Sequence, residues 1–338
     1  MNTFITKNCV IFGGTGFIGS HFTNYLLSNN LVENIYLFDL KPIRPFFDID
    51  DSRVHYIFGD VRNPIDENLL PNEISIIMNF AAIHREPGHE DHEYFETNLL
   101  GAENVGKFAE KVGCPNIIFT SSISPYGVSE SVKDETTLPI PVTAYGSSKL
   151  AAEKIHQIWQ AKDTNNRLLV IARPGVVFGP GEGGNVSRLI KAVIHRYFFF
   201  MGNRSTRKAG VYVKELCNAM WWVLQESKKN RGGVSLFNMT MNPGPSIGEY
   251  VKAVCKTQGI TRFVPTVPYK ALMCIAYCID AIAKPLGIKH PFSPVRIRKL
   301  VRSNNILPTY LVKHDYQFQY TLDSAFADWK KSCPEEWQ

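Results

Sequence analysis

Short apolar runs alternate with longer amphipathic stretches through the first half of the 338-residue chain. The runs have the length of strands, and the stretches between them carry apolar residues at helical spacing, as in YGSSKLAAEKIHQIW (145–159). Strands that alternate with helices predict parallel βαβ units, and right-handed crossovers then give a doubly wound sheet with helices on both faces. The predicted strands are 9–12, 34–39, 54–60, 74–82, 116–122 and 167–174.

After residue 174 this alternation is lost, and Gly/Pro clusters such as GPGEGG (179–184) separate shorter elements. We therefore expect an α/β sheet domain over residues 1–174 and a smaller, mixed α/β C-terminal lobe over residues 175–338. The lobe would mainly bind substrate, and some of its segments can return to the first domain.

The composition is that of a globular protein, with 44% hydrophobic and 20% charged residues. The net charge of +6 is not gathered in a Lys/Arg block, so it favours an anionic small molecule and argues against nucleic acid. The seven cysteines are scattered, and the start MNTFITKN runs straight into a predicted strand. We therefore expect reduced thiols and a cytoplasmic protein.

The most apolar later segment is ALMCIAYCIDAIAKPLGI (271–288). Asp280 and Lys284 interrupt it, and its uncharged core is shorter than the roughly 20 residues that span a bilayer. We therefore expect no integral membrane segment. A buried helix is the main prediction here, and docking on a membrane surface is the alternative.

The stretch CVIFGGTGFIGSHF (9–22) has the order strand, glycine turn, helix. Glycines let backbone N–H groups approach a pyrophosphate at a helix N-terminus. Asp39 ends the next strand, where a carboxylate accepts hydrogen bonds from the adenosine ribose and repels a 2′-phosphate. The sequence therefore predicts a Rossmann-type NAD site, although Lys41 and Arg44 keep NADP open. The predicted contacts of the turn are Gly13, Gly14, Gly16, Phe17, Ile18 and Gly19.

Further motifs follow in order: GDVRN (59–63), NFAAIH (79–84), FTSSISPYG (119–127), YGSSK (145–149) and RPGVVFGPG (173–181). With these motifs the sequence resembles the extended short-chain dehydrogenase/reductase superfamily, in particular its nucleotide-sugar epimerase/dehydratase branch. The resemblance implies NAD as cofactor, and it adds contacts beyond the glycine turn. These are Asp60, Val61, Ala81, Ala82, Asn98, Tyr145 and Lys149.

Tyr145 and Lys149 lie one helical turn apart, and Ser122 precedes them on a predicted strand. A free tyrosine has a pKa near ~10, and a neighbouring cation favours its phenolate form. We therefore expect Tyr145 to be the general acid/base and Lys149 to assist it and hydrogen-bond the nicotinamide ribose. Ser122 would hold the substrate oxygen. In isolation the pair would indicate only the first turn of an amphipathic helix; the upstream motifs favour catalysis.

The two residues after Ser122 limit which reactions of this superfamily the site could catalyse. In the superfamily that the sequence resembles, the 4,6-dehydratases carry an Asp–Glu pair there, and the nucleotide-sugar decarboxylases carry a glutamate at the second position. Ile123 and Ser124 stand at these positions. We therefore predict a 4-epimerase or 4-keto reductase of a nucleotide-activated sugar, and not a 4,6-dehydratase.

The resemblance also assigns substrate contacts, with basic residues for the nucleotide diphosphate. A solvated basic turn is the plain alternative for the pair at 207–208. The stretch Gly175-Val176-Val177 lacks an asparagine that often touches the sugar, which keeps open a 3β-hydroxysteroid-type or other apolar-alcohol dehydrogenase. The predicted substrate contacts are His84, Ser122, Arg207, Lys208 and Arg296.

Three further expectations complete the reading. A non-catalytic dinucleotide-sensing protein is disfavoured, because a sensor would not need the Ser122, Tyr145 and Lys149 set. No metal is expected, since the histidines at 84, 89 and 92 match no zinc spacing. The resemblance implies a homodimer that forms through two helices per subunit, including the one that starts near Tyr145. The apolar positions of that helix, which allow either a core or an interface, are Leu150, Ala151, Ile155 and Ile158.

Overall fold

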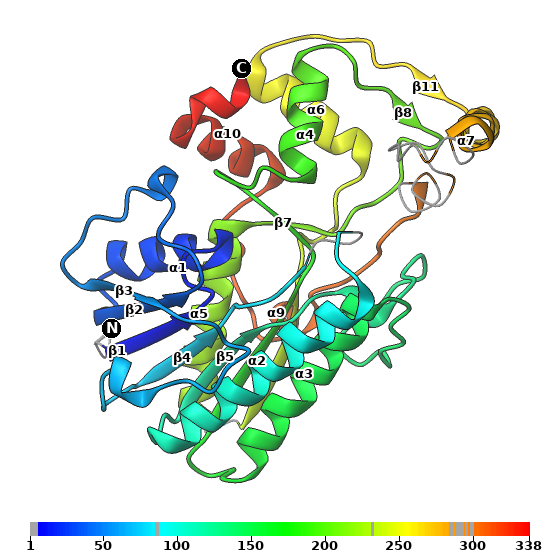
Figure 1. Ribbon diagram of the computed structural model, residues 1–338. Helices are drawn as coiled ribbons and strands as arrows, with labels where there is room; N and C mark the ends of the chain where they lie inside the picture. The colour runs from blue at the N-terminus through cyan, green and yellow to red at the C-terminus, as the bar shows by residue number, and fades with distance from the viewer. Residues whose placement is uncertain are drawn as a thin grey trace.

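The computed structural model describes residues 6–84, 88–230, 233–283, 287, 294, 297 and 301–338. Over these residues, a seven-stranded parallel sheet lies beside a smaller lobe (Figure 1). The predicted Rossmann-type doubly wound α/β fold is confirmed. The strand order is β10-β6-β5-β4-β1-β2-β3, with β1 Thr6–Phe12, β2 Val32–Asp39, β3 Val54–Phe58, β4 Ile76–Asn79, β5 Asn116–Thr120, β6 Leu168–Pro174 and β10 Val234–Met239.

The burial of each strand explains its sequence. Every residue of β4, β5 and β6 is buried, as expected for parallel strands with both faces covered, whereas β3 at the edge is partly exposed. Because all the pairings are parallel, the carboxyl ends of the strands meet at one edge of the sheet. The turns that follow the strands are therefore brought together there.

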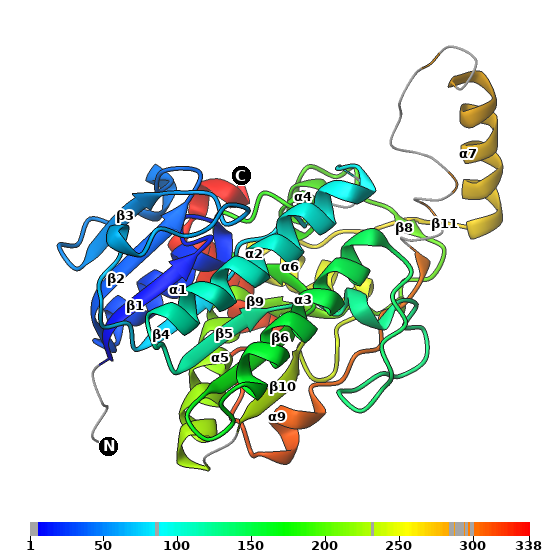
Figure 2. The same ribbon diagram turned by 60° about the horizontal axis from the view of Figure 1, so that its bottom comes forward.

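Two helical layers cover the sheet (Figure 2). Helices α1 (Phe17–Ser28) and α5 (Val213–Lys229) share one hydrophobic core with it, and α2 (Asp91–Lys111) and α3 (Ala144–Ala161) share a second. The single-turn 3-10 helices of this part are η1 Pro45–Phe47, η2 Glu67–Leu69 and η3 Ser124–Tyr126.

The chain crosses between the two parts several times. Although they follow residue 174, α5 and β10 belong to the sheet layer, and α9 (Thr309–Lys313) packs beside β10. A third hydrophobic core forms the centre of the smaller lobe around Phe178 and Trp329. The elements of the lobe are β7 Val176–Phe178, β8 Phe200–Met201, β9 Gly210–Tyr212, β11 Thr266–Val267, α4 Asn185–Ile194, α6 Ile247–Gln258, α10 Leu322–Ser332 and η4 Pro334–Trp337.

Helix α7 (Tyr269–Ala283) projects from the smaller lobe (Figures 1 and 2). Its inner side chains Leu272 and Ala276 are buried, whereas Ile282 is 67% exposed. The prediction of a buried helix at 271–288 is therefore wrong for the described part of this segment, because only one side of α7 meets the lobe. No helix within the described part of the chain has the length and apolarity to cross a bilayer.

A buried ion pair ties α3 to the sheet. The guanidinium of Arg173 on β6 donates two hydrogen bonds to the carboxylate of Glu153 on α3, at 2.8 and 2.6 Å. Ser121, directly after β5, donates its hydroxyl to the same carboxylate. Arg173 also lies over the ring of Tyr126, 4.8 Å from its centroid. One carboxylate thus fixes a helix against the carboxyl ends of two central strands.

We predict that Glu153→Gln lowers the free energy of unfolding by about 3–5 kcal/mol, because it leaves the Arg173 charge buried without a counter-charge. Chemical denaturation measures this loss. The control is Glu110→Gln on α2, whose carboxylate pairs with Lys162 at the surface and should contribute no more than about 1 kcal/mol. Equal losses in the two variants would contradict the structural role given to Glu153.

Candidate active site

The glycine turn between β1 and α1 lies so close to the neighbouring backbone that Gly13 has no room for a side chain. Gly13 has a φ of +75°, and a Cβ there would lie 2.6 Å from the backbone nitrogen of Ala81. Gly16 caps α1 without a side chain, so the first-turn amides of Phe17, Ile18 and Gly19 are those that a helix leaves for an external acceptor. The turn therefore fits a dinucleotide pyrophosphate.

Asp39 lies beside this turn, at the end of β2. Its Oδ2 accepts a hydrogen bond from the backbone N–H of Thr15 at 3.1 Å, so the half-buried carboxylate is fixed next to the glycines. The guanidinium of Arg44 stacks on Phe47, 4.6 Å from the ring centroid, and donates to the carbonyl of Gly181. Arg44 therefore has partners within the protein, whereas Lys41 is exposed. The carboxylate of Asp39 is the feature that favours NAD over NADP.

The other predicted cofactor residues follow β3 and β4 along the same edge. Asp60 forms an ion pair with Arg62 at 2.6 Å, and the Arg62 side chain holds the pKa of that carboxyl below its usual value. Val61 is buried, and Ala81 and Ala82 are half-buried beside the glycine turn.

Asn98 on α2 connects the segment after β4 to α3. Its buried side chain accepts a hydrogen bond from the N–H of Ile83 at 3.0 Å and donates to the hydroxyl of Ser148 on α3 at 2.9 Å. Asn98 therefore joins the segment after β4 to the helix that carries Tyr145 and Lys149. These contacts are with protein atoms, so they support the predicted site by positioning it.

The serine turn after β5 packs directly on the start of α3. Thr143 begins that helix, because its hydroxyl accepts the N–H of Gly146 at 3.1 Å. A Cβ at Gly146 would lie 2.8 Å from the carbonyl oxygen of Ser124, so only glycine allows this close approach. The hydroxyl of Ser122 hydrogen-bonds that of Ser124 at 3.1 Å. The structure therefore brings the Ser122 turn against the residue that follows Tyr145.

Lys149 is almost fully buried, with 2% of its surface exposed. Its Nζ lies 4.3 Å from the centroid of the Phe119 ring on β5. Burial lowers the pKa of Lys149 to about 7, and the charge of Glu153 one turn later opposes this shift. The ammonium is thus held at the sheet edge in a site where its charge is weakly screened.

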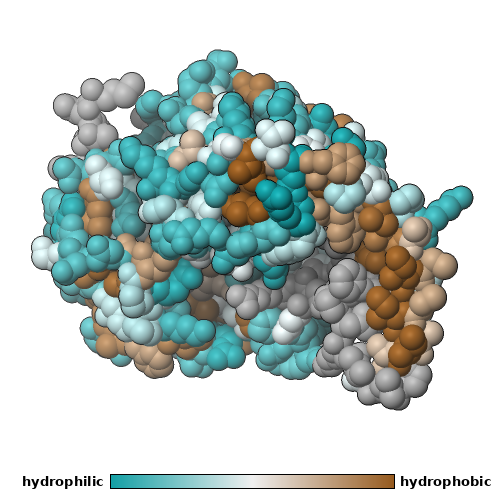
Figure 3. Space-filling view, turned by 90° about the horizontal axis from the view of Figure 1, so that it is seen from above, coloured by the Kyte–Doolittle hydropathy of each residue, from teal (hydrophilic) through white to brown (hydrophobic). Residues whose placement is uncertain are grey.

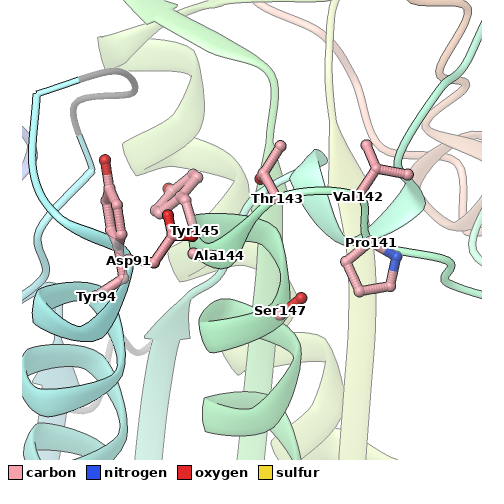
Figure 4. A pocket seen from close by; sticks show the side chains of 8 residues that line it. All are labelled: Asp91, Tyr94, Pro141, Val142, Thr143, Ala144, Tyr145 and Ser147. Carbon is pink, nitrogen blue, oxygen red and sulfur yellow. The ribbon is translucent and has the colours of Figure 1, made fainter.

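A pocket of about 510 Å³ opens in front of Tyr145 (Figure 4). Tyr94, from the first turn of α2, faces Tyr145 with the ring centroids 6.0 Å apart. Asp91 and Thr143 line the same pocket. The pocket exposes one side of the half-buried tyrosine at the N-termini of α2 and α3, and its lining does not include Ser122 or Lys149.

The predicted substrate-binding residues lie in both the sheet domain and the smaller lobe. His84 is exposed and directly follows the segment held by Asn98. In the smaller lobe, Arg207 donates to the carbonyl of Gly244 at 2.5 Å, and Lys208 donates to the carbonyl of Arg302 at 2.6 Å. Burial lowers the pKa of Lys208 to about 8.

Two predictions from the sequence concern Arg296 and metal binding. Arg296 lies outside the described residues, so the structure does not test its assignment. Among the residues that are described, no group of three or more His, Cys, Asp or Glu side chains could hold a metal ion.

Sequence reasoning missed the residues that support the site. Glu153 lies four positions after Lys149 and eight after Tyr145, so helical spacing alone places it on the same face. Tyr145 and Lys149 turn one face of this helix toward the sheet. A charged residue on that face needs a buried partner of opposite charge, and this requirement could have identified Glu153. Arg173 could not be chosen as that partner without the strand order.

We predict that Lys149→Met stabilises the cofactor-free protein at pH 6 relative to wild type. The folded pKa of about 7 lies below the ordinary 10.5, so the burial penalty is complete below pH 7 and fades as the pH rises toward 10.5. The advantage of the variant should therefore shrink by roughly 2 kcal/mol between pH 6 and pH 9.

Denaturation at a series of pH values measures this difference. Lys154→Met, which changes an exposed lysine on the same helix, is the control and should show no such trend. A Lys149→Met advantage that does not vary with pH would contradict a depressed pKa.

Comparison with known proteins places the chain among enzymes. It is 28% identical to N-acetyl-alpha-D-glucosaminyl-diphospho-ditrans,octacis-undecaprenol 4-epimerase of Escherichia coli O157:H7, over 95% of this chain and 93% of that protein. It is 24% identical to the decarboxylating sterol-4-alpha-carboxylate 3-dehydrogenase of Candida albicans, over 94% and 97% of the two chains.

The fold has close counterparts among solved structures. The UDP-glucuronic acid 4-epimerase from Bacillus cereus, in complex with NAD, has a TM-score of 0.75 at 19% identity, over 98% of this chain and 100% of that one. A model of the NAD dependent epimerase/dehydratase family matches residues 9–238. The cofactor is therefore NAD, as predicted. The chain belongs to the NAD dependent epimerase/dehydratase family of extended short-chain dehydrogenases/reductases and is an NAD-dependent epimerase or oxidoreductase.

Proposed function

We propose that the protein is a 4-epimerase of a sugar that is carried on a diphosphate group. The observation that supports this proposal is the composition of the site. The Ser122 turn packs on the start of the helix that carries Tyr145 and Lys149, and the two positions after Ser122 hold no carboxylate. Such a site can move a proton and a hydride, but it lacks the acid that elimination of water would need.

The proposed roles follow from position. Ser122 donates a hydrogen bond to the C4 oxygen, and Tyr145 accepts the proton of the C4 hydroxyl. NAD, which the glycine turn and Asp39 would hold, would supply the chemistry of accepting the C4 hydrogen as hydride and returning it. After the ketone turns over in the site, Tyr145 returns the proton to the C4 oxygen. Lys149 stabilises negative charge on Tyr145 throughout, because its ammonium lies in a weakly screened position.

The diphosphate is common to two candidate carriers. The name of the B. cereus enzyme specifies a uridine nucleotide, and Arg207 and Lys208 in the smaller lobe support an anionic carrier of this kind. The name of the E. coli relative specifies an undecaprenol carrier, and the exposed apolar helix α7 favours such a lipid-linked form. Either carrier holds its sugar through a diphosphate, and in this proposal C4 of that sugar reaches Tyr145.

A net oxidation of an apolar alcohol is the second candidate reaction. It is favoured by the sterol dehydrogenase of C. albicans, which matches this chain over nearly its whole length. The two reactions differ in their balance, because an epimerase ends with its NAD unchanged whereas a dehydrogenase releases a ketone and a reduced cofactor.

We also propose that the protein acts as a homodimer. Phe95 and Leu100 on α2 and Ile158 on α3 are exposed apolar side chains on two helices that pack against each other. A second copy would cover them.

We predict that Tyr145→Phe reduces kcat by about 10²–10⁴ while NAD still binds, because the variant loses only the hydroxyl that moves the proton. The measurement is incubation with N-acetylhexosamines and hexoses on uridine diphosphate and on a short prenyl diphosphate, with products identified by NMR and mass spectrometry. NAD binding is followed by fluorescence.

Tyr94→Phe is the matched control, since it removes a neighbouring hydroxyl from the same pocket. It should keep kcat within about threefold. Undiminished activity in Tyr145→Phe would remove the acid/base assignment. Wild-type conversion that yields a ketone together with reduced cofactor would replace the epimerase by the dehydrogenase.

A further inference from the structure

We propose that the outer face of α7 docks on an anionic lipid bilayer. The lipid-linked substrate in this inference rests on the proposed function. The docking surface is inferred from the exposed side chains of α7 and its surroundings, and it does not depend on that function. The outer face consists of apolar or thiol side chains along one line of the helix, at a spacing of three and four residues. These are Ala271, Cys274, Ile275, Cys278, Ala281 and Ile282.

The opposite face of α7 accounts for its attachment to the lobe. Leu272 and Ala276 are buried there against Phe199, Met201 and Val267. The helix is therefore already held by one apolar face, and the second apolar face is turned away from the protein. A solvent-facing helix surface is normally polar, so this face needs a cover.

Exposure along this face is large. Ile275 is 52% exposed and Ile282 is 67% exposed, and Tyr277 beside them is 54% exposed. Figure 3 shows hydrophobic side chains running along the projecting helix at one side of the molecule. In the same lobe, Tyr197 is 63% exposed just before β8 and Phe263 is 86% exposed just before β11. Tyrosine and phenylalanine at an exposed apolar margin are typical of a surface that sits at the level of lipid headgroups.

The sequence that follows α7 is basic, which favours an anionic surface. Between Asp280 and Asp315 the sequence contains seven Lys and Arg residues and no Asp or Glu. Within the described structure, Lys270 at the start of α7 is exposed, whereas Arg302 is half exposed and faces the carboxylate of Glu130 at 3.8 Å. Basic residues beside an apolar helix face are attracted to anionic lipids, each by about 1 kcal/mol close to the surface.

The dimensions of α7 fit a helix that lies in the interface. Its 15 residues extend for about 22 Å, which is shorter than the roughly 30 Å hydrocarbon core of a bilayer. A helix of this length with one apolar face lies along the membrane surface. Docking in this way would bring the site to a sugar whose diphosphate is attached to a polyprenol, because the polyprenol chain stays in the bilayer.

The exposed cysteines of α7 provide a direct probe. Cys274 and Cys278 are exposed, and the other five cysteines are buried or half-buried, so a polarity-sensitive thiol dye should label α7 selectively. With vesicles of phosphatidylglycerol and phosphatidylcholine, the dye emission should shift to the blue and the protein should float with the vesicles. Vesicles of phosphatidylcholine alone should bind at least tenfold less protein.

Unlabelled variants test which residues are responsible. Ile275→Glu/Ile282→Glu should reduce flotation at least tenfold, whereas the matched control Val234→Glu/Val312→Glu, at exposed positions of β10 and α9, should bind like wild type. The α7 variant should turn over a short-chain, water-soluble prenyl diphosphate sugar normally and lose activity only on the full-length carrier in vesicles.

Each outcome decides the proposal. Wild-type protein that ignores anionic vesicles, or a double variant that binds them as wild type does, overturns it. Self-association in the absence of lipid that is lost in the α7 variant would show that a second copy covers the face, which also overturns it. Failure to turn over any sugar diphosphate, with vesicle binding intact, would reject the proposed function and leave the docking surface standing.

Discussion

In addition to its apolar packing, helix α3 is fixed to the sheet by one buried carboxylate, and the candidate site depends on that attachment. Glu153 binds Arg173 of β6 and Ser121 at the end of β5, so the helix and two strand ends are fixed relative to one another. Lys149 lies one turn before Glu153 and Tyr145 lies one turn before that, on the same side of the helix. A shift of α3 would therefore move Tyr145, the proposed acid/base, relative to the serine turn.

This arrangement also explains how a buried lysine is tolerated. Burial lowers the pKa of Lys149, while the Glu153 carboxylate and the ring of Phe119 favour the ammonium form. Burial therefore opposes protonation of Lys149, and the contacts with Glu153 and Phe119 favour it. A positive charge of this kind stabilises a phenolate nearby more strongly than an exposed lysine would, because little water screens it.

Much of the fold could be predicted from the sequence, because its signals are local. The apolar runs predicted the six strands of the first half, and the glycine turn with Asp39 predicted the cofactor. Two features depend on tertiary packing and could not be predicted in the same way. The Glu153–Arg173 pair requires the neighbouring positions of β5 and β6, and the exposure of α7 requires knowing that only one of its two apolar faces meets the lobe. An apolar helix gives the same periodic pattern whether its second face is covered by protein or by lipid.

The proposed function is the inversion of one carbon of a sugar by reversible oxidation. A sugar diphosphate deuterated at C4 tests it most directly, with the product examined by NMR and mass spectrometry. The account predicts that the inverted sugar keeps its deuterium at C4, that none is lost to water and that no reduced cofactor accumulates. A deuterium-free ketone, with the label in released cofactor, would contradict it and show a dehydrogenase instead.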